Sequence, residues 1–82
     1  MLDDIKGITP LPEVAIVPET IDVLSIRQRI GLSQAAFATR FGISKRTLQE
    51  WEQGRHAPDA MARAFLTVIA KEPDAVRRAL AA

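Results

Sequence analysis

The sequence predicts a small all-α domain of five short helices that follows an extended N-terminal arm, with room for one short strand in the arm. Three observations predict this class. After residue 20, apolar side chains recur every three or four residues, as they do along one face of an amphipathic helix. Serine, aspartate and glycine residues stand where such helices would begin and end. No alternating strand pattern interrupts this region, so we expect an arm at 1–20 and a helical domain at 21–82.

The composition is that of an ordinary globular domain, and it excludes several classes of protein. Of the 82 residues, 48% are apolar and 26% are charged. The absence of cysteine excludes disulfides, thiolate catalysis and cysteine-based zinc sites. The apolar runs are too short to cross a membrane, and the acidic start Met1–Asp4 does not resemble a signal peptide. We therefore expect a cytoplasmic protein without a membrane partner.

The small net charge of +1 hides an uneven distribution of charged residues. Residues 1–22 carry one lysine and five acidic residues, whereas residues 23–82 carry ten lysines and arginines and five acidic residues. A basic segment of this kind suggests a nucleic acid or an acidic partner. A solvated charged surface is the alternative explanation, and the charge alone does not decide between them.

The arm is expected to be extended because Pro10, Pro12 and Pro18 remove backbone donors and interrupt any helix. Between them, residues 13–17 are rich in β-branched side chains and form a candidate edge strand. A lone strand is unstable in water, so the arm would pair with another protein, pair within a dimer, or stay loose. Its apolar residues are therefore candidates for partner binding: Val14, Ala15, Ile16 and Val17.

Each of the five helices is delimited by residues that favour helix ends. The helices are expected at Val23–Ile30, Gln34–Phe41, Lys45–Gln53, Asp59–Ala70 and Asp74–Ala82. The first three would begin after the N-cap residues Asp22, Ser33 and Ser44 and would stop at Gly31, Gly42 and Gly54. Pro58 precedes the fourth helix, and Pro73 separates it from the fifth.

Most apolar helix residues are expected to share one core. Trp51 follows Leu48 by three residues on one helix face, so we expect it to pack inward rather than to stack on a ligand. Val76 and Leu80 come late in the chain, where little remains to cover them. They would either close the core or form part of a two-fold dimer patch, which makes them further candidates for partner binding.

Two helices joined by the tight turn Gly42-Ile43-Ser44 are typical of a helix-turn-helix motif, whose second helix enters the major groove of DNA. The outward face of that helix would carry hydrogen-bonding side chains. Lys45 or Arg46 would suit guanine. Gln49 would suit adenine, and Glu50 the cytosine amine. A helical hairpin with a merely solvated polar face is the alternative.

The stretch from Leu32 to Pro58 resembles the Xre family of phage-repressor and Cro-like proteins. The resemblance is carried by Leu32-Ser33-Gln34-Ala35-Ala36-Phe37-Ala38, by Phe41-Gly42-Ile43-Ser44, and by Leu48-Gln49-Glu50-Trp51-Glu52-Gln53-Gly54-Arg55-His56-Ala57-Pro58. Members share Ser-Gln at the start of helix two, a glycine at the turn, and Trp-Glu-x-Gly-x-x-x-Pro after helix three. The resemblance implies a lambda-repressor-like five-helix fold and DNA binding.

Within that family, the chain is similar to the HigA-like antitoxins of bacterial type II toxin–antitoxin pairs. The similarity lies in the run Arg46–Arg55, in Phe65-Leu66 followed by Lys71-Glu72-Pro73-Asp74, and in the proline-bearing arm. It implies a homodimer that represses its own operon at a palindromic operator and masks an mRNA-cleaving toxin of RelE-like fold. A stand-alone repressor without a toxin is the alternative, and an interaction adaptor that keeps the fold as a scaffold is a further one.

The resemblance also implies roles for individual residues. It implies base contacts by Lys45, Arg46 and Glu50. It implies phosphate contacts by a second set of residues: Gln34, Ser44, Thr47 and Arg55. Gln49 would serve either purpose. Many relatives carry glutamine where this chain has Lys45 and Glu50, so the Glu50 carboxylate needs Arg46 or a cytosine amine beside it.

No arrangement of residues predicts catalysis, a cofactor or a metal. Ser33, Ser44, His56 and Asp59 provide no nucleophile with an oriented base. The four glycines are isolated from one another, so no glycine-rich phosphate loop is expected. His56 is the single histidine, which leaves no pair of histidines for a metal. We therefore expect a binding protein rather than an enzyme.

Overall fold

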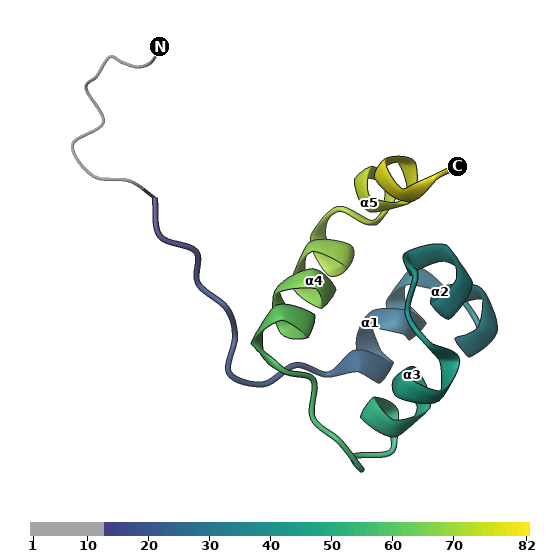
Figure 1. The fold of residues 1–82 in the computed structure, drawn as a ribbon, viewed down its shortest axis with the longest axis horizontal. Coiled ribbons are helices and arrows are strands. Elements are labelled where there is room, and N and C mark those ends of the chain that lie inside the picture. Colours follow the sequence, from purple (N-terminus) through teal and green to yellow (C-terminus); the bar gives the residue numbers. More distant parts are fainter. Residues whose placement is uncertain (1–12) are drawn as a thin grey trace.

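The computed structural model describes residues 13–82 and contains five helices within them. Their bounds are α1 Val23–Ile30, α2 Gln34–Phe41, α3 Lys45–Glu52, α4 Ala60–Lys71 and α5 Pro73–Leu80 (Figure 1). The expected all-α class is confirmed. The first two helices match their expected bounds, whereas α3 ends one residue earlier and α4 begins and ends one residue later. The last helix, α5, begins at Pro73 rather than at Asp74 and ends at Leu80 rather than at Ala82.

The helix ends follow the capping residues of the sequence. The side chains of Asp22, Ser33 and Ser44 accept hydrogen bonds from the backbone N–H groups three residues later, at 3.0, 3.1 and 3.2 Å. Asp59 was expected inside α4, but its carboxylate accepts from the Ala62 N–H at 2.8 Å, which makes it the N-cap. A capping side chain is worth about 1 kcal/mol, so local chemistry sets these bounds.

A single apolar core fixes the arrangement of the helices. Its fully buried side chains come from α2, α3 and α4: Phe37, Phe41, Leu48, Leu66 and Ile69. The rings of Phe37 and Phe41 meet edge to face, with centroids 4.8 Å apart. Trp51 is half-buried and packs against this core, as expected. The apolar spacing thus located most of the core. Met61 on α4 shares that spacing and was expected in the core as well, but its side chain is 83% exposed, so this prediction was wrong.

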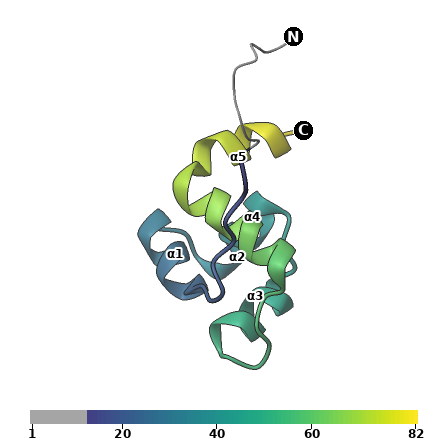
Figure 2. The ribbon, with the colours of Figure 1, turned by 90° about the vertical axis from the view of Figure 1, so that its left-hand side faces the viewer.

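The core also decides the placement of the last helix. Val76 on α5 is only 7% exposed and belongs to the core, so the first of its two expected roles is the one observed, and it is not available as a surface for a partner. Leu80, one turn later, is 52% exposed. In both views α5 lies at one end of the helical body and α3 at the other (Figures 1 and 2).

The described part of the arm runs outside this body. Residues 13–20 are extended, and the candidate strand at 13–17 is not formed, because no other strand within residues 13–82 pairs with it. The arm is anchored by Arg63 on α4, whose Nε donates to the Pro18 carbonyl at 2.7 Å and whose Nη1 donates to the Pro58 carbonyl at 2.8 Å. From this anchor the arm extends toward the α5 end, away from α3 (Figures 1 and 2).

Candidate nucleic-acid interface

The turn between α2 and α3 directs one face of α3 outward. Gly42 adopts a φ of 70°, which a side chain would strain, and so ends α2 sharply. The Ile43 N–H then donates to the Ala38 carbonyl at 3.0 Å, and its side chain packs against the core. Leu48 is fully buried beneath α3. Because the helix has about 3.6 residues per turn, the residues opposite Leu48 face solvent.

The outward face of α3 carries the residues expected to meet DNA. Lys45 and Arg46 are exposed, and the Arg46 side chain is 87% accessible. Gln49 and Glu50 follow one turn later and are half-buried. Ser44 is exposed at the start of the helix, although its hydroxyl already caps the Thr47 N–H. The face therefore presents two cations followed by an amide and a carboxylate.

Glu50 lies beside a cationic side chain of the protein itself. Its carboxylate lies 3.5 Å from Arg46 Nε on the same helix and 4.0 Å from His56 Nε2 in the following loop. Its backbone carbonyl accepts the Arg55 N–H at 2.9 Å, which fixes the loop that carries Arg55 and His56 beside the end of α3. Arg46 thus provides the cation that was expected beside Glu50. Arg55, in the loop that follows α3, is exposed.

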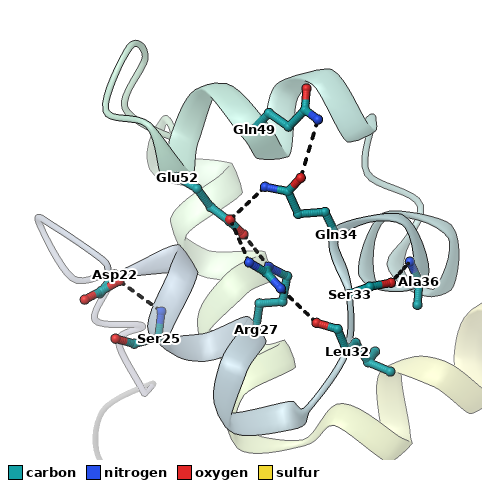
Figure 3. A network of polar contacts seen from close by, with 9 residues as sticks. All are labelled: Asp22, Ser25, Arg27, Leu32, Ser33, Gln34, Ala36, Gln49 and Glu52. Carbon is teal, nitrogen blue, oxygen red and sulfur yellow. Dashed lines mark hydrogen bonds and ion pairs between the residues drawn. The ribbon is translucent and has the colours of Figure 1, made fainter.

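A polar network behind this face ties α3 to α1 and α2 (Figure 3). At its centre, the Glu52 carboxylate accepts from Arg27 Nε at 2.6 Å and from Arg27 Nη2 at 3.0 Å. Both side chains are largely buried, with 6% of Glu52 and 15% of Arg27 exposed. Arg27 Nη1 also donates to the Leu32 carbonyl at 2.9 Å, at the entrance to α2.

The Arg27–Glu52 pair keeps the carboxylate ionised. The hydrogen bonds from Arg27 hold the pKa of the Glu52 carboxyl below its ordinary value of 4.5, although burial acts in the opposite direction. A smaller contribution in the same direction comes from the amide of Gln34, which donates to Glu52 Oε1 at 3.0 Å. The same hydrogen bonds raise the pKa of Arg27. Both groups are charged at neutral pH.

Gln34 connects this ion pair to the outward face. Its Oε1 accepts from Gln49 Nε2 at 3.4 Å, so the amide spans the gap from Glu52 to Gln49 (Figure 3). The side chain expected to meet a phosphate is thus engaged inside the protein. The backbone N–H of Gln34 lies in the first turn of α2, where N–H groups lack partners within the helix and can still meet an anion.

The sequence reasoning did not find Arg27 and Glu52. The two residues are 25 positions apart, so no local pattern joins them. One signal was present: Glu52 follows the buried Leu48 by four residues and therefore lies on nearly the same side of the helix. A carboxylate in that position requires a cation, and Arg27 lies on the neighbouring helix in a matching position.

Residues 23–68 match the family model described as helix-turn-helix, which covers more than half of the chain. The chain belongs to the helix-turn-helix family. It is 36% identical over 62 residues to Antitoxin HigA-2 of Vibrio cholerae serotype O1, and the match covers 76% of this chain and 58% of that relative. The chain thus spans less than two thirds of the length of that relative.

A solved structure described as an HTH XRE-family like protein from Agrobacterium tumefaciens is also similar. It is 41% identical with a TM-score of 0.69, and the match covers 73% of this chain and 98% of that one. The expected Xre-type helix-turn-helix fold and the likeness to HigA antitoxins are therefore confirmed. This family consists of regulators and antitoxins rather than enzymes, as the sequence indicated.

In this helix-turn-helix protein, α2 and α3 form the motif and α3 is its recognition helix. The Arg27–Glu52 pair and Gln34 lie behind that helix and hold it against α1 and α2. Within residues 13–82, no cluster of three or more histidine, aspartate or glutamate residues could hold a metal ion. None of the helices in this part of the chain is both long and apolar enough to span a bilayer.

Proposed function

We propose that this protein is a sequence-specific DNA-binding antitoxin that represses its own operon as a dimer and neutralises an mRNA-cleaving toxin of RelE-like fold. The observation that carries the DNA-binding part is the outward face of α3, which presents Lys45 and Arg46 to solvent while a buried network holds the helix in place. The likeness to Antitoxin HigA-2 supports the antitoxin part.

The DNA contacts divide into two groups by chemistry, and Gln49 would serve in either of them. The first group would reach base edges in the major groove: Lys45, Arg46 and Glu50. The second group would meet the phosphate backbone: Gln34 through its backbone N–H, Ser44, Thr47 and Arg55. The two copies of a dimer would read half-sites about 34 Å apart. Because a two-fold axis would relate the two copies, the operator would be palindromic.

The DNA-binding part is tested by fluorescence anisotropy with the DNA upstream of the protein's own gene and with a scrambled duplex of equal length. We expect tight binding to the upstream DNA alone, with an affinity that falls steeply as salt is raised, because lysine and arginine displace counterions from phosphates. Equal binding to both duplexes would contradict a sequence-specific regulator, and the absence of binding would favour the adaptor alternative.

Arg46 gives the sharpest single-residue prediction at this interface. Its side chain is exposed and held by Glu50 at 3.5 Å, an arrangement that suits a guanine at one position. We expect Arg46→Ala to cost about 1–3 kcal/mol and to relax the preference at that base pair, measured with a set of single-base operator variants. Lys71→Ala on α4 is the matched control. A uniform loss on all sequences would instead assign Arg46 to a phosphate.

The arm is the proposed site for the toxin. Val14 and Ile16 are exposed, and the arm extends toward the α5 end, so that a partner there would leave α3 free for DNA (Figure 1). Extended apolar segments bind partners by adding a strand to an exposed sheet edge. The candidate residues are Val14, Ala15, Ile16 and Val17, and the exposed Leu80 is a second candidate.

Deletion of residues 1–20 tests this assignment. We expect the shortened protein to bind the operator as the full chain does and to lose the toxin, measured by co-purification with the product of the neighbouring gene. Loss of dimerisation on deletion, measured by analytical ultracentrifugation, would make the arm a dimer element instead.

A stand-alone repressor is the second candidate function. The XRE-family like protein from Agrobacterium tumefaciens is 41% identical to this chain, and membership of that family fits a repressor as well as an antitoxin. Such a protein would need the DNA-binding domain and no toxin surface. A small basic protein encoded next to this gene favours the antitoxin, and its absence favours the repressor.

A further inference from the structure

We propose that Glu52, acting through Gln34, fixes which end of the Gln49 amide faces DNA, and that Gln49 thereby reads an adenine. The inference deepens the proposed function and rests on DNA binding by α3. It assigns Glu52 and Gln34 as positioning residues, because neither of their side chains would touch a base. The argument follows the donors and acceptors of three hydrogen-bonded side chains.

The first step is the chemistry of Glu52. An ionised carboxylate accepts hydrogen bonds at both oxygens and donates none. Glu52 is ionised because Arg27 donates to both of its oxygens, at 2.6 and 3.0 Å. With only 6% of its side chain exposed, this carboxylate has little access to water. Any side chain beside it must therefore present a donor.

The second step is the orientation of Gln34. Its amide lies 3.0 Å from Glu52 Oε1, and because Glu52 only accepts, the NH₂ group must point toward Glu52. The carbonyl oxygen of the same amide then points the other way. Gln49 Nε2 meets that oxygen at 3.4 Å. A carbonyl oxygen only accepts as well, so Gln49 must turn its own NH₂ group toward Gln34.

The third step concerns the hydrogen-bonding groups of the Gln49 amide that remain available to DNA. With its NH₂ group directed at Gln34, Gln49 turns its Oε1 away from the protein, as Figure 3 shows. The outward side of the amide therefore offers one acceptor and the second N–H. Adenine presents the complementary pair in the major groove, a donor at N6 and an acceptor at N7.

The same orientation of the Gln49 amide disfavours its two alternative partners, guanine and the phosphate backbone. Guanine presents two acceptors, O6 and N7, so its O6 would oppose the outward oxygen of Gln49. Phosphate oxygens are acceptors too and would oppose it in the same way. An unrestrained glutamine would avoid both conflicts by turning its amide over. The network removes that freedom and makes Gln49 selective for adenine.

The test uses operator variants in which each A·T pair is changed in turn to G·C. In the unaltered protein, one position should show a preference of about tenfold or more for A·T that Gln49→Ala abolishes. Gln34→Met has a similar length, cannot orient Gln49, and leaves the Arg27–Glu52 pair in place. We expect it to reduce the preference at that same position to about twofold or less.

Two further variants separate positioning from folding. Glu52→Gln can accept or donate, so it should also relax the preference at that position, whereas Gln53→Ala, an exposed neighbour on α3, should retain it. Urea unfolding identifies any variant whose loss of binding is a loss of fold. In the free protein, the side-chain amide resonances of Gln49 should shift in Gln34→Met and stay unchanged in Gln53→Ala.

The outcomes distinguish this inference from the proposed function. Specific DNA binding with a full preference for A·T in Gln34→Met would overturn the inference and leave the function intact. Unshifted Gln49 resonances in Gln34→Met would overturn it without any DNA. The absence of specific binding by the unaltered protein would instead overturn the function on which the inference rests.

Discussion

The arm at residues 13–20 and the helical body at residues 23–80 use their apolar side chains in opposite ways. In the body, Phe37 and Leu48 are fully buried, and every helix contributes to one core. In the arm, Val14 is exposed and Ile16 is 89% exposed. The body therefore folds on its own apolar residues, whereas those of the arm contribute nothing to that core and remain free for a partner.

The largest expected effect is a loss of stability when a core side chain of the helical body is removed. Phe37→Ala removes a fully buried ring that packs edge to face on Phe41, and we expect it to lower the free energy of unfolding by about 3–5 kcal/mol. The measurement is urea denaturation followed by circular dichroism. Ile16→Ala in the arm is the matched control and should change that free energy by less than about 0.5 kcal/mol. Similar losses in both variants would mean that the arm belongs to the folded core.

The body was also the part that the sequence predicted well. The apolar spacing and the capping residues Asp22, Ser33 and Ser44 placed α1 and α2 at their observed bounds. Local signals sufficed because each cap acts within three residues of itself. The candidate strand at 13–17 has no second strand to pair with among residues 13–82, because a strand depends on a partner that its own β-branched composition does not supply.

The candidate site was predicted only in part. Helical periodicity identified the outward residues Lys45 and Arg46, because exposure repeats with the turn of the helix. It did not reveal that Gln34 is engaged by Glu52, since that contact joins residues 18 positions apart. Contacts of this range depend on how helices pack, which periodicity does not encode.

The next effect concerns the acid sensitivity of the body. The pKa of the Glu52 carboxyl is lowered by Arg27, so the folded state binds its proton less readily than the unfolded state does. The stabilisation is present above the ordinary value of 4.5 and is lost as the pH falls through the lowered value. We expect the free energy of unfolding to decline from about pH 5 downward, measured by urea denaturation.

A paired variant identifies the source of this decline. The double substitution Arg27→Met and Glu52→Met removes both buried charges together and should make the acid decline shallower. Asp74→Asn removes an exposed carboxylate that lies 3.7 Å from Arg77, and it should leave the decline as it is. An unchanged slope in the double variant would assign the acid sensitivity to other carboxylates, of which Asp22 also has a lowered pKa.

A smaller effect is expected when the contact between the arm and the helical body is removed. Arg63→Ala removes the donors to the carbonyls of Pro18 and Pro58, and we expect a loss of about 1 kcal/mol in the free energy of unfolding. Proteolysis within residues 13–20 should become faster, because the arm loses its anchor on α4. Arg78→Ala, an exposed arginine on α5, should change neither. Unaltered proteolysis in Arg63→Ala would mean that other contacts hold the arm.

The smallest effect on stability is expected in the arm itself, where the functional effect should be large. Ile16→Ser exchanges an apolar side chain that is already 89% exposed, so the free energy of unfolding and the operator affinity should stay within error of the unaltered protein. Binding to the proposed toxin, measured by calorimetry, should weaken at least about tenfold if Ile16 is buried at that interface. Glu19→Ser, exposed near the anchor, is the control and should bind as before. Undiminished toxin binding by Ile16→Ser would move the search for that surface from the arm to Leu80 on α5.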